Sequence, residues 1–348
     1  MAVYTSIDNP AEYFETVLYT GNGASTPGGS GSTQTISSLD FSPNLVWIKD
    51  RTSAHNHNLI DTVRGAPNIL QADNGNVEVT DSSDALTSFT SNGFVIGDNG
   101  EGTQLLELNK SSNTYVAWCW KESATAGFDI VSYTGNATDD VDISHSLSAV
   151  PHVIIVKNRD NSNGESWAVY HHKNTSAPET DRLYLNTTGA TGDDDEFWSD
   201  EVPTSSVFTI GRQDVINTSS GNHIAYLWSE KQGFSKFGSY TSNNNSNGPF
   251  IYTGFRPRFV LVKNIDATGS WMINDTARDT FNTTTSNSLM PDLSNAEDVN
   301  GEAMDILSNG FKCRATGVKQ NTGSNVFIYM AFAEAPFVNS NGVPCNAR

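Results

Sequence analysis

Continuous apolar runs, each ended by a lysine, recur three times along the chain. They read LVWIK at 45–49, VIIVK at 153–157 and FVLVK at 259–263. An apolar run without polar alternation is typical of a strand that is buried on both faces. The lysines Lys49, Lys157 and Lys263 are separated by 108 and 106 residues, which is close to the size of a single domain. The pattern therefore predicts a tandem repeat with one central strand in each copy.

Two further landmarks keep this spacing. One is a tyrosine followed by a polar turn, in LYTGNG, SYTGNA and SYTSNN, and the other is an aromatic residue two positions before a glutamate, at Trp120, Trp228 and Phe332. Because the three landmarks recur at similar spacing, they set the boundaries of the repeated units. The predicted organisation is an N-terminal arm (1–16), unit 1 (17–123), unit 2 (128–231), unit 3 (236–335) and a C-terminal tail (336–348).

The fold class predicted for each unit is all-β. Gly, Pro and Ser/Thr/Asn stretches punctuate short apolar runs, as in proteins made of many strands and turns. Units 1 and 3 share an SNGF motif, which predicts a tight hairpin at Asn92–Gly93 and Asn309–Gly310. We expect three tandem antiparallel β-sandwiches of the jelly-roll or lectin-like type. Units of this length are large enough to bury their own cores, and the short joints between them predict packed neighbours.

Charge narrows the range of partners. The chain has 20 basic and 39 acidic residues, a formal net charge of -19, which disfavours binding to nucleic acid because phosphate contacts need a basic surface. No apolar run reaches about 18 residues, so we expect no membrane insertion. The first residues lack the features of a signal peptide. Three scattered cysteines, Cys119, Cys313 and Cys345, disfavour a disulfide framework.

The recurring charged residues are the first candidates for chemistry. The three repeat lysines could form a catalytic or anion-binding series, but each ends a buried strand, where geometry alone would place a solvated charge. The motif Asp-Thr-x-Arg follows the lysine in two units, as Asp61 with Arg64 and Asp275 with Arg278. We interpret these as charge pairs that brace a turn. Unit 2 has VYHHKN at the same place and lacks both charges.

Metal ligands and catalytic motifs give weaker signals. His55 and His57 would share a face of a strand, and a second histidine pair stands at His171 and His172, but no third ligand is indicated nearby. The acidic tracts GDDDEFW (192–198) and DDVD (139–142) offer carboxylates to Ca²⁺ without the spacing of a known loop. No nucleophile elbow, zinc motif or nucleotide fingerprint occurs. We expect no catalytic residue, metal or cofactor, although paired carboxylates of a glycosidase would leave no sequence motif.

Aromatic residues outside the strands are the candidates for ligand contact, because an exposed ring can stack on a sugar. Trp167 and Trp271 follow their repeat lysines at similar distances, which indicates a place in the core. Tyr170 lies in the same region. Trp198, in the acidic tract, is therefore the one residue predicted to contact a glycan.

Several of these phrases resemble a known group of proteins. YFETVLYTGNG, FSPNLVWIKDR, LTSFTSNGFVIG, YVAWCWK and YMAFAEAPFVNSNGVPCNAR are similar to the repeated modules of uncharacterised virion proteins from tailed bacteriophages, notably marine ones. The resemblance covers nearly the whole chain and is most specific at its two ends. It implies a particle-exposed protein without enzymatic activity. Unit 2 departs from the pattern by lacking the Trp of VWIK and the SNGF turn.

We therefore expect a protein on the exterior of a bacteriophage virion, made in the host cytoplasm. The leading hypothesis is a tail-fibre or receptor-binding appendage that contacts host-surface carbohydrate. One alternative is a capsid decoration protein, either a cement protein or a head fibre, which contacts other virion proteins. A second alternative is a polysaccharide-degrading enzyme on a sandwich scaffold. The three linked copies would multiply a weak affinity if all engage together. A homo-oligomer is expected, with a trimer as one arrangement, because trimers are common among such appendages.

Overall fold

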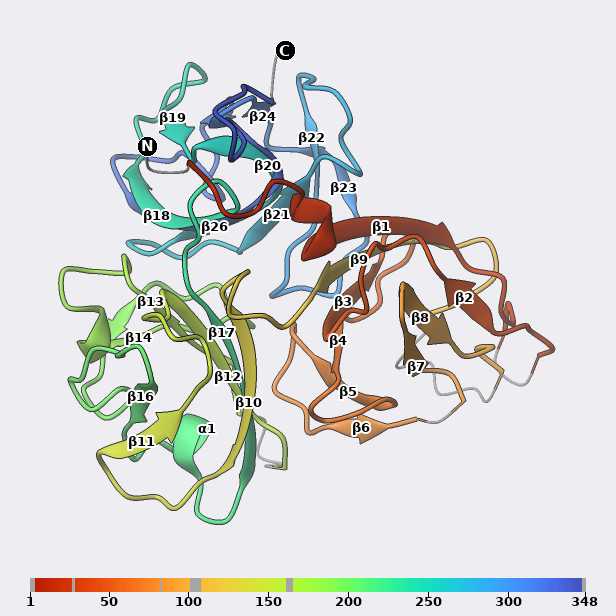
Figure 1. The fold of residues 1–348 in the computed structure, drawn as a ribbon, viewed down its shortest axis with the longest axis horizontal. Coiled ribbons are helices and arrows are strands. Elements are labelled where there is room, and N and C mark those ends of the chain that lie inside the picture. The colour runs from red at the N-terminus through yellow and green to blue at the C-terminus, as the bar shows by residue number, and fades with distance from the viewer. Residues whose placement is uncertain (1–3, 27–28, 82, 101–107, 161–164, 346–348) are drawn as a thin grey trace.

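The structure is a computed structural model and describes residues 4–26, 29–81, 83–100, 108–160 and 165–345. It is nearly all β, with antiparallel sheets packed as sandwiches, as the sequence predicts. Figure 1 shows three lobes arranged around a common centre, one for each predicted unit. No helix in the described part of the chain is long and apolar enough to cross a membrane.

Each unit contains a large sheet whose first four strands follow one order. In unit 1 the order is β1 (Phe14–Thr20), β9 (Thr114–Trp120), β3 (Leu45–Asp50) and β4 (Asn58–Asp61), continued by β5 (Asn68–Gln71) and β6 (Val79–Thr80). In unit 2 it is β10 (Phe128–Thr134), β17 (Asn222–Trp228), β12 (Val153–Asn158) and β13 (Ala168–His171). In unit 3 it is β18 (Ser235–Thr241), β26 (Val326–Pro336), β20 (Phe255–Asn264) and β21 (Met272–Asp275). The lysine-ended runs thus occupy β3, β12 and β20, the third strand of each sheet.

A smaller sheet covers one face of each large sheet. It is formed in unit 1 by β2 (Gln34–Ile36), β8 (Gly93–Ile96) and β7 (Leu86–Thr90), and in unit 3 by β19 (Phe250–Tyr252), β25 (Gly310–Cys313) and β24 (Met304–Leu307). In the described residues of unit 2 this sheet consists of β11 (Val141–Ser144) and β16 (Val207–Ile210), which agrees with the missing SNGF motif. The remaining elements are η1 (Pro10–Glu12), η2 (Pro178–Thr180), β14 (Asp181–Arg182), β15 (Gly192–Asp193), α1 (Asp214–Asn217), β22 (Ser286–Ser288) and β23 (Asp298–Gly301).

Both predicted SNGF hairpins form, but their turns lie one residue earlier than predicted, at Ser91–Asn92 and Ser308–Asn309, and the glycines begin the return strands. Gly93 pairs with Thr90, and Gly310 pairs with Leu307, across two-residue turns. A Cβ atom on Gly93 would lie 1.7 Å from the carbonyl oxygen of Ile36 in the neighbouring strand, and one on Gly310 would lie 2.0 Å from that of Ile251. The motif therefore allows a third strand to approach closely, which is why glycine is needed there.

Alternate residues of the central strands enter two different cores. In β3, Val46 and Ile48 face the small sheet of unit 1, whereas Leu45 and Trp47 face the centre of the molecule. Strands β12 and β20 divide their residues in the same way. This explains the absence of polar alternation, because both faces of each strand are buried.

A single central cluster joins all three units. It includes Trp120 from unit 1, Trp228 from unit 2 and Phe332 from unit 3, which are the three aromatic landmarks of the repeat. Trp120 lies 6.2 Å from Trp228 and 5.7 Å from Phe332, measured between ring centroids. The prediction of packed neighbours is confirmed. Each unit also buries a core of its own between its large and small sheets, as expected. The units are nevertheless not self-sufficient, because the inward face of every large sheet packs in the shared central cluster.

The N-terminal arm links unit 1 to unit 3 (Figure 1). Ile7 enters the central cluster, and Ser340 of the C-terminal tail donates its backbone N–H to the Asp8 carboxylate at 2.7 Å. Strand β1 begins at Phe14, inside the predicted arm, since Phe14 pairs with Trp120. Residues 1–3 of the arm and 346–348 of the tail lie outside the described part of the chain.

Candidate functional site

The three repeat lysines are fully buried, so the expectation of solvated charges is wrong. Their side chains have no exposed surface, and burial lowers the pKa of each to about 8. Each ammonium group donates to a carbonyl oxygen of its own unit: Lys49 to Asp50 at 2.8 Å, Lys157 to Glu165 at 2.8 Å and Lys263 to Gly269 at 2.6 Å. A buried charge requires such acceptors. The lysines are therefore structural, although for a different reason from the one predicted.

Each lysine also donates to a carbonyl oxygen of a neighbouring unit. Lys49 of unit 1 bonds Ser294 of unit 3 at 3.1 Å, Lys157 of unit 2 bonds Gly75 of unit 1 at 3.1 Å, and Lys263 of unit 3 bonds Thr188 of unit 2 at 3.0 Å. Units 1, 2 and 3 thus bond units 3, 1 and 2 in turn. The three bonds close a cycle around the molecule.

A second contact repeats at each of these interfaces. The backbone N–H groups of Glu297, Glu78 and Thr191 donate to the carbonyl oxygens of Arg51, Arg159 and Ile265, at 3.0, 2.9 and 3.0 Å. At two interfaces the side chains also pair, with Arg51 to Glu297 at 2.8 Å and Arg159 to Glu78 at 2.7 Å. At the third interface Ile265 stands in place of the arginine and Thr191 in place of the glutamate. Both members of the ion pair are thus replaced by uncharged residues.

The predicted Asp–Arg pairs are confirmed. Arg64 Nε lies 2.5 Å from Asp61 Oδ2, and Arg278 Nε lies 2.6 Å from Asp275 Oδ2. Each aspartate also accepts backbone N–H groups of the following turn. A neighbouring unit completes both sites: Tyr226 donates its hydroxyl to Asp61 at 2.8 Å, and Trp118 donates its indole N–H to Asp275 at 3.0 Å. These groups hold units together and face no solvent.

The histidines singled out in the sequence also form hydrogen bonds within and between units. In unit 2, His171 takes the place of Asp61 and Asp275, and its Nε2 lies 3.1 Å from the carbonyl oxygen of Tyr329 in unit 3. Burial lowers the pKa of His171 to about 3 and that of His172 to about 4. His57 accepts the Trp47 indole N–H at 3.0 Å, while His55 contacts Asp50 at 2.8 Å.

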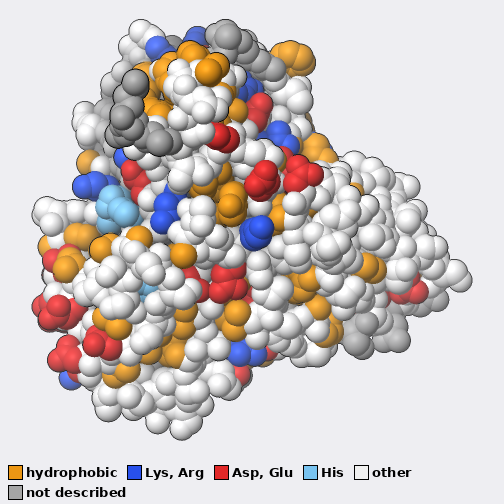
Figure 2. All heavy atoms as spheres, viewed as in Figure 1, with side chains coloured by type: hydrophobic (Ala, Val, Ile, Leu, Met, Phe, Trp, Pro, Cys, Tyr) orange, Lys and Arg blue, Asp and Glu red, His pale blue; other side chains and the backbone are white. Residues whose placement is uncertain are grey.

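The two acidic tracts come together on the surface of unit 2, where Figure 2 shows a concentration of acidic side chains. Asp139 and Asp140 of one tract line a shallow depression of about 130 Å³ with Asp195 and Glu196 of the other. Arg212 forms an ion pair with Glu196 at its rim. Across the described ranges of the chain, no group of three His, Cys, Asp or Glu residues is arranged to hold a metal ion.

Trp198 does not offer a ring to a glycan, so its prediction as a contact residue is wrong. It is 1% exposed and packs in the core of unit 2, where its indole N–H donates to the carbonyl oxygen of Asp181 at 3.1 Å. Its position next to an acidic tract suggested a loop, but the apolar pair Phe197–Trp198 turns inward. Trp167, Tyr170 and Trp271 are buried too, as expected for Trp167 and Trp271 from their recurrence.

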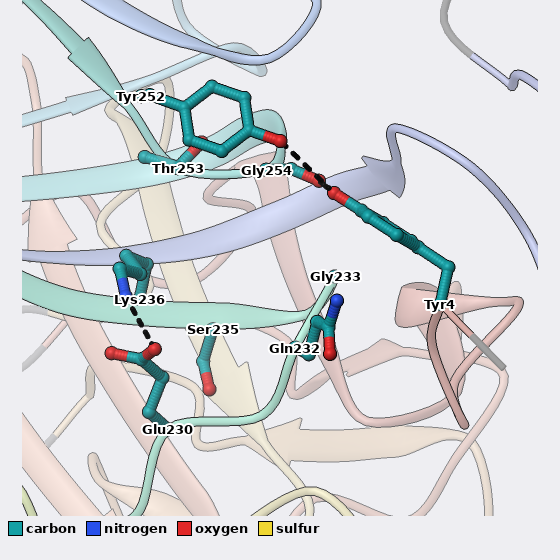
Figure 3. Close-up of a pocket in the computed structure, with 9 residues that line it drawn as sticks. All are labelled: Tyr4, Glu230, Gln232, Gly233, Ser235, Lys236, Tyr252, Thr253 and Gly254. Atoms are coloured by element: carbon teal, nitrogen blue, oxygen red, sulfur yellow. Dashed lines mark hydrogen bonds and ion pairs between the residues drawn. The ribbon is translucent and has the colours of Figure 1, made fainter. Parts of the chain in front are cut away.

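One surface pocket combines exposed aromatic and charged side chains, and we name it the Tyr4–Tyr252 pocket (Figure 3). It has a volume of about 310 Å³ and is lined by Tyr4, Glu230, Gln232, Gly233, Ser235, Lys236, Tyr252, Thr253 and Gly254. The N-terminal arm, the joint between units 2 and 3, strand β18 and the end of β19 all contribute. The pocket therefore exists only in the assembled chain and is not repeated in units 1 and 2 as the same set of side chains.

The two sides of this pocket differ in character (Figure 3). On one side the hydroxyls of Tyr4 and Tyr252 lie 3.4 Å apart, and Tyr4 also donates to the carbonyl oxygen of Gly254 at 2.7 Å. Burial, together with the contact to Tyr252, raises the pKa of Tyr4. On the other side Lys236 Nζ pairs with Glu230 Oε1 at 2.6 Å.

Sequence reasoning missed this pocket because Tyr4 and Tyr252 are far apart in the chain. A local signal existed in PFIYTG, where Phe250 and Tyr252 alternate with an apolar residue. Phe250 and Tyr252 are 46% and 54% exposed, whereas Ile251 between them is 6% exposed. Such alternation at the edge of a sheet marks outward-facing aromatics.

Comparison with known protein families places all three units in one sequence family. Comparison with curated proteins finds no match. Residues 9–336 match the family described as a domain of unknown function, DUF7483. This match begins within the predicted arm and runs through all three units. The chain therefore belongs to the DUF7483 family.

Proposed function

We propose that the protein is a non-enzymatic structural component on the exterior of a bacteriophage virion, and that it acts as a receptor-binding appendage contacting host-surface glycan. The observation that carries this proposal is the use of the repeated polar groups. The lysines, the Asp–Arg pairs and the histidine that replaces them all bond neighbouring units. The polar residues that recur in the three units therefore bond the units to one another. The outer surface remains available for contact with a partner. The resemblance to virion modules supports the particle location.

A capsid decoration protein is the second candidate. It is favoured by the closed cycle of contacts and the shared core, since these features make a rigid body suited to covering a particle surface. In both cases the partners include other virion proteins. A homo-oligomer, such as a trimer, would add avidity to either role.

Fluorescently labelled protein incubated with host cells and with particles stripped of this protein tests the proposal. Saturable binding to cells supports the appendage, and coating of stripped particles supports decoration. Binding to neither surface contradicts both. Release of reducing sugar from host capsular polysaccharide, abolished by a single Asp or Glu substitution, would show an enzyme instead.

A further inference from the structure

We infer that the Tyr4–Tyr252 pocket binds an uncharged sugar ring, which stacks on an exposed tyrosine and bonds Glu230, Gln232 and Lys236 through its hydroxyls. This inference rests on the proposed contact with glycan and assigns it a place and a ligand class. It is carried by the aromatic surface, the polar groups, the charge and the size of the pocket.

The aromatic surface comes from residues that a folded protein would otherwise bury. Tyr252, which lines the pocket, is 54% exposed on the edge strand β19, and Phe250, 46% exposed on the same strand, lies outside the pocket lining. Tyrosine offers a large apolar face together with a polar end, and it loses little conformational freedom on binding. The strand and the Tyr4 contact hold Tyr252 in place before any ligand arrives. A sugar ring presents an apolar face of C–H groups that fits such a surface.

The polar groups match the hydroxyls of a sugar, which both donate and accept. Glu230 supplies carboxylate acceptors, Lys236 supplies ammonium donors, and the amide of exposed Gln232 supplies both. The Glu230–Lys236 pair fixes the two charged groups 2.6 Å apart, so their remaining hydrogen-bonding positions are oriented. Ligand pockets in general combine apolar walls with a few such placed groups.

The charge of the pocket selects against acidic sugars. Glu230 balances Lys236 within the pocket, and the whole chain carries a formal net charge of -19. A carboxylated or sulfated sugar would find no unpaired cation among these lining residues and would be repelled at long range. The volume of about 310 Å³ is at the lower end of the range for small-molecule sites, which fits a terminal sugar unit.

Saturation-transfer NMR and calorimetric titration of the full chain test this inference. The probes are methyl glycosides of glucose, galactose, mannose and N-acetylglucosamine, with methyl glucuronide and N-acetylneuraminic acid as acidic counterparts. We expect at least one neutral glycoside to bind and the acidic ones to bind at least about tenfold more weakly. Tyr252→Ala should weaken binding about tenfold or more. Tyr252→Phe, which keeps the ring, should stay within about threefold.

Phe281→Ala is the matched control, because Phe281 is an aromatic residue of unit 3 that is 75% exposed and does not line the pocket. It should leave binding unchanged. Preference for an acidic sugar, or neutral binding that Tyr252→Ala leaves intact, overturns the inference while the proposed glycan contact stands. Binding to cells without binding to any probe also overturns the inference alone. Failure to bind cells and probes overturns both.

Discussion

Arg64 illustrates how single residues are held at the contacts between units. Its guanidinium group has no exposed surface and bonds Asp61, Glu78, the carbonyl oxygen of Leu59 and the hydroxyl of Tyr226. Despite burial, the neighbouring Tyr226 and the acids raise its pKa. The side chain therefore remains charged and ties β4 to the next strand and to unit 2.

Replacing Arg64 by methionine should strongly destabilise the protein. The substitution leaves the Asp61 carboxylate buried without its cation, which typically costs about 3–5 kcal/mol. Chemical denaturation measures the loss in free energy of unfolding. Arg212→Met is the control, because the Arg212 side chain is 58% exposed in its pair with Glu196 and should cost less than about 1 kcal/mol. Equal losses for the two variants would contradict the role given to Arg64.

His171 makes the stability depend on pH. Its pKa of about 3 in the folded protein lies below the ordinary value of 6.5, so the unfolded chain binds more protons as pH falls below 6.5. The stability contributed by neutral His171 is therefore fully present above pH 6.5 and is lost toward acid. Between pH 6.5 and 4.5 the loss from this group is about 2–3 kcal/mol.

The His171→Gln variant tests this dependence, because its amide N–H can donate to the Tyr329 carbonyl oxygen in place of Nε2 without taking up a proton. The groups near His171 that also respond to pH or carry charge are His152, His172 and Lys173. Beyond them, Glu230 acts on both His152 and His172, and Lys236 acts on His152. These are unchanged in the variant. Urea unfolding at pH 7 and 4.5 should show a smaller loss for His171→Gln than for the natural chain. Parallel losses would contradict the assignment.

Single residues were predictable where the chemistry is local. The Asp–Arg pairs follow from a three-residue spacing, and the buried positions of Trp167 and Trp271 follow from their recurrence. Lys49 could not be placed, since one of its acceptors, Ser294, comes from the other end of the chain. Trp198 was misplaced because a neighbouring acidic tract says nothing about which way an aromatic side chain turns.

At the scale of strands, features set by neighbouring residues could be predicted from the sequence, and features set by distant residues could not. The continuous apolar runs correctly predicted strands buried on both faces, and SNGF correctly predicted two hairpins. The sequence did not show which elements cover the second face of each large sheet. An apolar residue such as Trp47 indicates burial, but its sequence neighbours do not specify that two other units provide the cover.

Gly93→Ala tests the close approach of strands in the small sheet of unit 1. The added methyl group would clash with the Ile36 carbonyl oxygen, so β2 must move away from β8. We expect a loss of about 1–3 kcal/mol in the free energy of unfolding. Gly189→Ala is the control, because its Cβ would meet only Thr187, at 3.6 Å. A neutral effect of Gly93→Ala would show that the small sheet adjusts freely.

At the scale of the whole molecule, the central cluster and the cycle of lysine bonds predict one cooperative unit. A single unit separated from the others would expose the inward face of its large sheet and leave its buried lysine without one acceptor. Calorimetry should therefore record one unfolding transition for the complete chain, with equal calorimetric and van't Hoff enthalpies. Two or three separate transitions would show that the units are independent.

The direction of the lysine cycle limits how the three units can diverge. Each interface takes its donor from one unit and its acceptor from another, and at the one interface without an Arg–Glu pair both partners differ, as Ile265 and Thr191. A change on one side thus selects for a compensating change on a partner that lies between 74 and 246 residues away in the chain. Recombination that imports a single unit from a relative would mismatch two interfaces at once. Exchange between relatives should accordingly preserve whole chains and leave variation to the exposed loops.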